Sequence, residues 1–238
     1  MNTMIRNNVK LKFIKSFEKE FWFVDNNYSG ARKVIGKDRF LYIVNHNIPN
    51  CLDESFSGLR DKVKEHIESN KGEIIRLIDE KGNELEKKWR KIEDAFFRQM
   101  EEATEIKWKY KEYNIYLLFS CLWGGDYDIG APNIYINPLL EYGDPLYVVF
   151  HELSHLMYWE FVSESYPQSF IQKNKDFLWR LSEVMVNYPL LKLKLKTKIP
   201  LVIPENLAEE SKGLVKRFSK ESFKEIIKCE IDYDGDSP

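Results

Sequence analysis

Two of the four histidines in this 238-residue chain, His151 and His155, stand four positions apart with Glu152 between them. On an α-helix, residues i and i+4 project from the same face, so the two imidazoles would lie close enough to share one metal ion. Zn²⁺ takes four ligands at about 2 Å from nitrogen or oxygen, and two imidazoles supply half of them. Glu152 would lie off the metal face, where its carboxylate can accept a proton from water. The H-E-x-x-H spacing therefore predicts a hydrolytic zinc site.

A single helix over residues 145–163 is expected to position all three side chains. Asp144 followed by Pro145 is typical of a helix start, because aspartate caps the first turn and proline is tolerated at the first helical position. The other residues of this segment are mostly large and apolar, which predicts burial on nearly every side. Buried imidazoles and a buried carboxylate need partners, and a metal ion would supply them. A chance match to the motif would normally lie on a polar helix instead.

The third protein ligand is harder to assign. No histidine follows His155, so the H-E-x-x-H-x-x-G-x-x-H arrangement of ligands is excluded. Glu160 and Glu164 share the helix of His155 but do not return to the metal, and we expect them to be solvated. Glu183 lies on the next helix among apolar residues, which predicts burial and makes it the expected third ligand. If Glu183 instead faces solvent, the ligand would come from a later carboxylate such as Glu205 or Glu209.

The helix that carries Glu183 is expected to be capped by Asp176 and stopped by Pro189. Four residues beyond Glu183, Asn187 would share its face of the helix. Its side chain is predicted to orient a histidine ligand through a hydrogen bond to the imidazole ring, without binding the metal itself.

Helices are expected to dominate the first half of the chain. Residues 53–106 are rich in charge and helical in pattern. Their last segment places apolar residues on one stripe at 3.6-residue spacing: Leu85, Trp89, Ile92, Phe96 and Met100. One strand is predicted earlier, at residues 39–45, from its run of apolar and aromatic residues.

Two strands are predicted between these helices and the H-E-x-x-H helix, at residues 113–123 and 133–137. Residues 124–132 are expected to form a loop between them. Near the end of the chain, residues 190–198 alternate Leu and Lys and permit either a strand or a helix, and residues 219–231 predict a short amphipathic helix.

Charge and composition limit the class of protein. The chain has 36 Lys and Arg against 38 Asp and Glu, so neither nucleic acid nor a membrane surface is predicted as a partner. With 43% hydrophobic residues, it can bury a substantial core. Its three cysteines form no C-x-x-C pattern, which predicts neither a disulfide framework nor a cysteine zinc site. No apolar run reaches the length of a secretory signal or a membrane span, so we expect a cytoplasmic protein.

The sequence H-E-L-S-H, with a glutamate 28 residues after its second histidine, resembles the gluzincin branch of zinc metallopeptidases, which has a thermolysin-like core. The resemblance covers about residues 85–190, where a helix, two strands and the H-E-x-x-H helix occur in the family's order. It implies that His151, His155 and Glu183 bind zinc and that Glu152 is the general base. It also implies a small sheet whose edge strand borders the cleft and holds the substrate backbone.

The chain departs from the thermolysin type at two points. In that type an aspartate follows the ligand glutamate by four residues, whereas Asn187 stands here. No histidine remains to stabilise the oxyanion, so a tyrosine would have to do so, and the candidates are Tyr127, Tyr158 and Tyr188.

These observations predict an α+β fold that is mostly helical, with a small mixed sheet whose edge strand packs on the H-E-x-x-H helix. We expect an N-terminal region at residues 1–84, a catalytic core at 85–190 and a C-terminal helical segment at 191–238, all in one compact unit. The predicted function is zinc-dependent hydrolysis of peptides or unfolded proteins. If residues 133–137 form an edge strand, they would bind an extended substrate by strand addition.

Two other functions remain open from the sequence. The protein would be a zinc-binding scaffold with a regulatory or interaction role if the metal only holds helices together, although such a site has no use for Glu152. Alternatively, the histidines are core residues, and the helices at 53–106 and the Leu/Lys stretch contact an acidic partner or a membrane surface.

Overall fold

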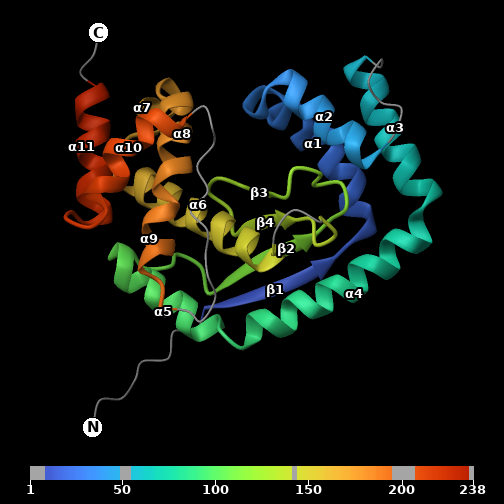
Figure 1. Ribbon diagram of the computed structural model, residues 1–238, viewed down its shortest axis with the longest axis horizontal. Helices are drawn as coiled ribbons and strands as arrows, with labels where there is room; N and C mark the ends of the chain where they lie inside the picture. Colours follow the sequence, from blue (N-terminus) through green and yellow to red (C-terminus); the bar gives the residue numbers. More distant parts are fainter. Residues whose placement is uncertain (1–8, 49–54, 141–143, 195–206, 236–238) are drawn as a thin grey trace.

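The computed structural model describes residues 9–48, 55–140, 144–194 and 207–235, and in it a small sheet is surrounded by helices (Figure 1). The strands are β1 (Lys10–Lys15), β2 (Glu112–Leu117), β3 (Gly125–Tyr127) and β4 (Asn133–Ile136). The helices are α1 (Phe17–Ile35), α2 (Lys37–Asn47), α3 (Phe56–Ser69), α4 (Lys71–Arg90), α5 (Glu93–Thr104), α6 (Pro145–Ser165), α7 (Gln168–Lys173), α8 (Lys175–Met185), α9 (Asn187–Lys192), α10 (Ala208–Arg217) and α11 (Phe223–Gly235). The predicted α+β, mostly helical fold class is confirmed.

The sheet is mixed, with the strand order β1-β2-β4-β3. β1 and β2 are parallel, as are β2 and β4, while β3 runs antiparallel to β4. The edge strand β3 lies against α6. Residues 133–136 form a strand as predicted, but it is not the edge strand that substrate binding at this segment would require, because part of the expected loop at 124–132 folds back as β3 and makes β4 an interior strand. A strand of three residues is too short to produce a recognisable periodicity.

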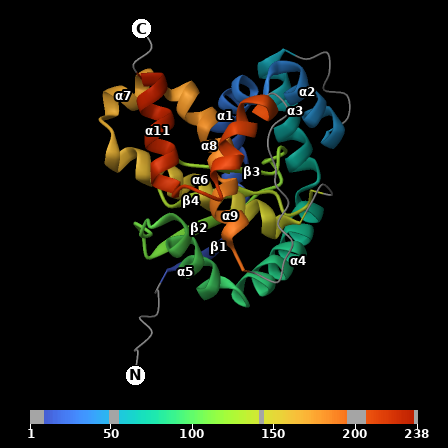
Figure 2. The ribbon, with the colours of Figure 1, turned by 60° about the vertical axis from the view of Figure 1, so that its left-hand side comes forward.

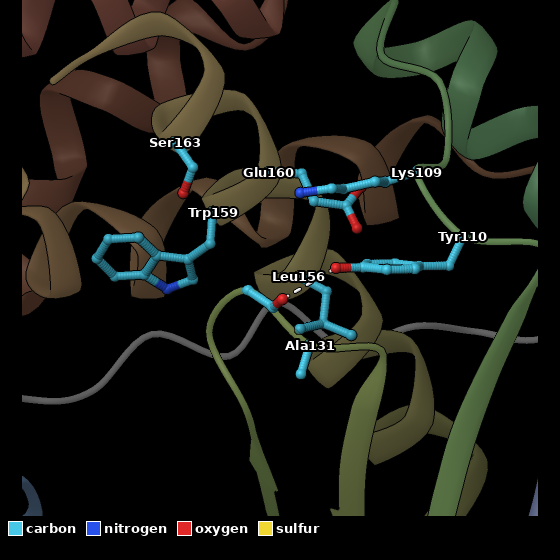
Figure 3. Close-up of a pocket in the computed structure, with 8 residues that line it drawn as sticks. Lys109, Tyr110, Ala131, Leu156, Trp159, Glu160 and Ser163 are labelled. Atoms are coloured by element: carbon cyan, nitrogen blue, oxygen red, sulfur yellow. Dashed lines mark hydrogen bonds between the residues drawn. The ribbon is translucent and has the colours of Figure 1, made fainter. Parts of the chain in front are cut away.

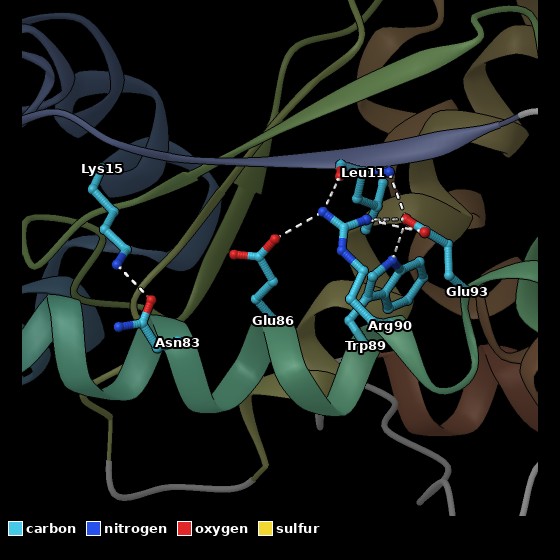
Figure 4. Close-up of polar contacts among 7 residues, drawn as sticks. All are labelled: Leu11, Lys15, Asn83, Glu86, Trp89, Arg90 and Glu93. Carbon is cyan, nitrogen blue, oxygen red and sulfur yellow. Dashed lines mark hydrogen bonds and ion pairs between the residues drawn. The ribbon is translucent and has the colours of Figure 1, made fainter.

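The other edge strand, β1, is fastened to the corner between α4 and α5 by one buried carboxylate (Figure 4). Glu93 Oε1 accepts hydrogen bonds from the Leu11 backbone N–H at 2.8 Å, from Trp89 Nε1 at 2.7 Å and from Arg90 Nη1 at 2.8 Å. Arg90 Nη2 also donates to the Leu11 carbonyl oxygen at 3.0 Å. A strand from the first 84 residues is therefore built into the same sheet as β2 and β4.

Two predicted elements in the first half of the chain need correction. Residues 39–45 are not a strand but part of α2, which buries Phe40 and Val44 one turn apart. Their β-branched and aromatic content suggested a strand, but burial of one helical face overrides such local preferences. The apolar stripe from Leu85 to Met100 belongs to two helices, α4 and α5, which are separated at Lys91 and Ile92.

Helix α6 lies at the centre of the molecule in both views of the fold (Figures 1 and 2). It packs against β3 and β4 on one side and against α8 and α9 on another. Its start is as predicted, because Asp144 Oδ1 accepts a hydrogen bond from the Leu146 backbone N–H at 3.1 Å and Pro145 is the first helical residue. Within the described ranges, no helix combines the length and apolar character needed to span a bilayer.

The helices after α6 follow the predictions in part. α8 begins at Lys175 after Asn174, so Asp176 lies in the first turn rather than at the cap, and Pro189 lies inside the first turn of α9 rather than ending α8. The expected helix at 219–231 is α11, which starts later, after a capping box in which Ser222 and Glu225 exchange hydrogen bonds. Of the segment 190–198, α9 includes residues 190–192, and residues 195–198 lie outside the described residues.

Candidate metal centre

His151 and His155 project from the middle of α6 and face each other through their Nε2 atoms, which are 3.1 Å apart. Their ring centroids are 4.7 Å apart, and the ring planes are nearly perpendicular at 80°. This is the side-by-side placement that the four-residue spacing predicted. One turn of a buried helix thus brings two imidazole nitrogens to one point.

Glu183 reaches the same point from α8. Its carboxylate oxygens lie 3.8 Å from His151 Nε2 and 3.5 Å from His155 Nε2. Four ligands at the usual zinc distances are about 3.3 Å apart in a tetrahedral arrangement, so the three separations suit one such ion. Of the residues that the structure describes, His151, His155 and Glu183 are the group whose histidine, cysteine or carboxylate atoms converge closely enough to hold a metal.

Burial keeps the two imidazoles in the form that binds metals. It lowers the pKa of His151 to about 4 and that of His155 well below its ordinary value, so both rings are neutral near pH 7. Burial also raises the pKa of Glu183 to about 7. Within the described part of the chain, neither ring's buried Nδ1 has a hydrogen-bond partner. A cation between the Nε2 atoms and the carboxylate would offset the burial of all three groups.

The ring of His155 is held on its other side by the edge strand. Tyr127, the last residue of β3, stacks on His155 with ring centroids 4.6 Å apart and planes inclined by 15°. The Tyr127 hydroxyl accepts a hydrogen bond from Trp159 Nε1 at 3.0 Å, which anchors the phenol to α6 one turn beyond His155. Tyr127 therefore holds the ring of His155 in its orientation.

Glu152 lies on a different face of α6 from the ligands, as predicted, and it is 6% exposed. Its carboxylate rests against the backbone of β3 at Gly125. A Cβ on Gly125 would come within 2.6 Å of Val148 Cγ1 and closer still to the Glu152 carboxylate, so only glycine allows β3 to approach the helix this closely. Burial, with the nearby carboxyl groups of Asp126 and Glu183, raises the pKa of Glu152 well above its ordinary value.

Asn187 does not orient a histidine as predicted. Its Nδ2 donates to the backbone carbonyl oxygens of Glu183 and Val184, both at 3.2 Å. Asn187 is the first residue of α9, so it holds the junction of α8 and α9 rather than an imidazole. The alternative ligand Glu205 lies outside the described residues, as does the side chain of Glu209.

Reasoning from the sequence did not identify two residues that lie near the candidate metal centre. Burial is the main cause that raises the pKa of the Asp126 carboxyl to about 6. The sequence predicts a loop at this position, because the three residues of β3 show no pattern typical of a strand. Tyr147 lies one turn before His151, with ring centroids 6.0 Å apart. The four-residue spacing that identified His155 would also have identified Tyr147.

Glu160, expected to be solvated, is instead buried, and it lines a cavity of about 40 Å³ beside α6 (Figure 3). Its Oε1 accepts a hydrogen bond from the Tyr113 hydroxyl at 2.8 Å, whereas its buried Oε2 has no partner within the described residues. The exposed Lys109 and the hydroxyl of Tyr110 lie at the rim. The cavity has room for a few water molecules, which would satisfy Oε2. Glu164 is exposed, as predicted.

Comparisons with known proteins give no further guidance, because no protein-family model, curated protein or solved structure matches this chain. Any functional conclusion must therefore come from the chemistry of the site.

Proposed function

We propose that this protein is a zinc-dependent metallopeptidase that hydrolyses peptide bonds in peptides or unfolded proteins. The observation that supports this best is the convergence of His151 Nε2, His155 Nε2 and a Glu183 oxygen at a largely buried point where the imidazoles are neutral. Glu152 stands beside the first ligand without joining the cluster, as a general base should. The resemblance to gluzincins supports the same assignment.

Two imidazoles and one carboxylate are a donor set that suits zinc, with a fourth position left for water, although iron(II) also binds to such a set. When bound, Zn²⁺ would acidify a water molecule towards a pKa of about 7 and polarise the scissile carbonyl. Harder cations such as Mg²⁺ and Ca²⁺ prefer shells made of oxygen alone.

Glu152 would carry the proton during hydrolysis. Its carboxylate accepts a proton from water as the water oxygen bonds to the carbonyl carbon, and it then gives that proton to the amine nitrogen as the C–N bond breaks. The carboxyl is buried and close to two other carboxyl groups, so it is a stronger base than an exposed glutamate. A cation on the neighbouring ligands would favour its ionised form.

The edge strand β3 suits an extended substrate. It borders α6 between Gly125, which touches Glu152, and Tyr127, which stacks on His155. An extended peptide added beside β3 would pass both the base and the ligands. Folded proteins cannot present such a segment, so we expect cleavage of peptides and unfolded chains.

A zinc-binding scaffold without catalysis is the second candidate. It is favoured by the way the ligands join two helices, since His155 on α6 is only 2% exposed and Glu183 comes from α8. A metal at this point would stabilise the packing of α6 on α8 whether or not substrate binds.

The test begins with zinc content per chain, measured by mass spectrometry on protein purified without added metal. We expect one zinc per chain and cleavage of denatured casein that a chelator abolishes. Glu152→Gln should retain zinc and lose activity by about a hundredfold or more, because the amide cannot accept the proton. Glu164→Gln, on the exposed side of the same helix, is the matched control and should behave like wild type.

Each result separates the candidates. Casein cleavage that survives Glu152→Gln would contradict the mechanism. Stoichiometric zinc without cleavage would favour the scaffold, and absence of zinc would mean that the histidines are core residues.

A further inference from the structure

The hydroxyl of Tyr147 is buried, and among the described residues it has no hydrogen-bond partner. A buried hydroxyl without a partner costs about 1–3 kcal/mol, so a role for it in binding a ligand is worth testing. Tyr147 stands one turn before His151 on α6, and its ring is inclined by 45° to the imidazole. The phenol therefore extends along the stripe of α6 that carries both histidine ligands.

Two carboxyl groups of the site act on the hydroxyl of Tyr147, whose ring contacts that of His151. Apart from burial, the groups that raise its pKa are Glu152 and Glu183, which are the proposed base and the proposed third ligand. The hydroxyl thus keeps its proton at neutral pH and is available as a donor.

The other tyrosines near the site do not match this combination. The Tyr127 hydroxyl has a partner, because it accepts a hydrogen bond from Trp159 Nε1, and the Tyr188 hydroxyl donates to the Glu221 carbonyl oxygen at 3.0 Å. Tyr158 also has a buried hydroxyl without a described partner, but the groups that affect its pKa besides burial are Tyr127 and Tyr166, not the carboxyl groups of the site. Tyr158 therefore resembles Tyr147 in its buried hydroxyl, but differs from it in the groups that act on that hydroxyl.

We propose that the Tyr147 hydroxyl donates a hydrogen bond to the oxygen of the scissile carbonyl as that oxygen gains negative charge. This inference rests on the proposed peptidase function. It assigns the role of oxyanion donor to a tyrosine, because no histidine follows His155 in the sequence. Water adds to the carbonyl carbon, the π electrons move to the oxygen, and Glu152 takes the water proton. Tyr147 keeps its own proton throughout and stabilises charge that the substrate does not carry in its ground state.

Tyr147→Phe removes the hydroxyl and nothing else. For cleavage of denatured casein by the zinc-loaded protein, we expect kcat to fall by about 100-fold to 1000-fold with KM little changed, as when one oxyanion donor is lost. Zinc content should stay at the wild-type value. The melting temperature should stay the same or rise, because the variant no longer buries a polar atom without a partner.

A binding measurement tests the same role without turnover. A dipeptide phosphonamidate carries a tetrahedral, charged phosphoryl group like the transition state, whereas a dipeptide thiol binds the metal without one. Tyr147→Phe should weaken the phosphonamidate by about a hundredfold and leave the thiol unchanged. Tyr158→Phe, the matched control, should change neither affinity and should retain wild-type kcat.

The possible results distinguish a failure of this inference from a failure of the proposed peptidase function. A zinc-dependent wild type whose kcat and phosphonamidate affinity survive Tyr147→Phe overturns the role of Tyr147 and leaves the peptidase proposal standing. A fall in kcat that comes with equal weakening of the thiol, or with a lower melting temperature, assigns Tyr147 a structural role and overturns the inference. A wild type without zinc overturns both proposals.

Discussion

Two buried glutamates in the N-terminal half and two at the metal centre are stabilised in different ways. Glu93 accepts hydrogen bonds from a backbone N–H, an indole and a guanidinium, and Glu20 accepts the backbone N–H groups of Phe119 and Ser120, both at 2.8 Å. For Glu183, burial alone shifts the pKa upwards, and for Glu152 burial acts together with two other carboxyl groups. The described residues supply no donor that offsets this effect at either position.

The difference separates carboxylates that have hydrogen-bond donors within the fold from carboxylates for which the described residues supply none. A buried carboxylate with several donors can join distant segments, as Glu20 joins α1 to the backbone of Phe119 and Ser120 and Glu93 joins α5 to β1. A buried charge without donors is unfavourable until a ligand arrives, and that cost is tolerated where function requires it. The polar groups around His151 and His155 belong to the second kind.

The largest effect should come from removing a ligand. Glu183→Gln replaces a charged oxygen ligand by an amide, so we expect zinc affinity to fall by more than about a hundredfold. Asn187→Ala, which removes hydrogen bonds to the backbone carbonyls of Glu183 and Val184, should reduce it by less. Competition with a fluorescent chelator measures both. Equal affinities in wild type and Glu183→Gln would mean that another group is the third ligand.

The next prediction concerns the fold without metal. In chelator-treated protein, Glu93→Gln should lower the free energy of unfolding by about 2–3 kcal/mol, because Arg90 and the Leu11 N–H lose a charged acceptor. Glu183→Gln should leave the stability unchanged or raise it, since it removes a buried charge that has no donors. Urea unfolding measures both variants. Equal losses in the free energy of unfolding for the two variants would mean that hydrogen-bond donors do not distinguish Glu93 from Glu183.

Glu160 is intermediate, since one oxygen is bonded to Tyr113 and the other has no partner in the part of the chain that the structure describes. Burial raises its pKa from 4.5 to about 7, so between these values the folded protein binds more protons than the unfolded chain. Stability from this group is therefore present at low pH and lost as the pH rises from about 4.5 through 7. Relative to Glu160→Gln, wild type should lose about 2–3 kcal/mol across that window. Urea unfolding at several pH values measures this, with the exposed Glu164→Gln as control; a constant difference would refute it.

Much of the candidate site could be predicted from the sequence because it depends on one helix. The four-residue spacing places His151 and His155 together in any α-helix, and Asp144 with Pro145 starts that helix at the right residue. Glu183 could be chosen because an acid among apolar residues on the next helix has few other reasons to be there. These inferences need only helical geometry and the cost of burying charge.

Other predictions failed where contacts between distant segments decide the outcome. Residues 39–45 have the composition of a strand, but α2 forms because its Phe40 and Val44 are buried on one helical face. Glu160 appeared to be a solvated helix residue, yet β2 brings the Tyr113 hydroxyl to it. In each case a partner far along the chain overrides the local signal.

The sequence by itself thus determined the two converging histidines, the glutamate between them and the helix that carries them, because all of these lie within a few turns of one α-helix. Tertiary structure decided what surrounds them. Three residues, Gly125–Tyr127, become a strand only because β4 offers its edge, and that pairing brings Tyr127 onto His155 and the backbone of Gly125 against Glu152. Helical geometry is local and repeats every 3.6 residues, whereas strand pairing depends on residues that the chain must first bring together.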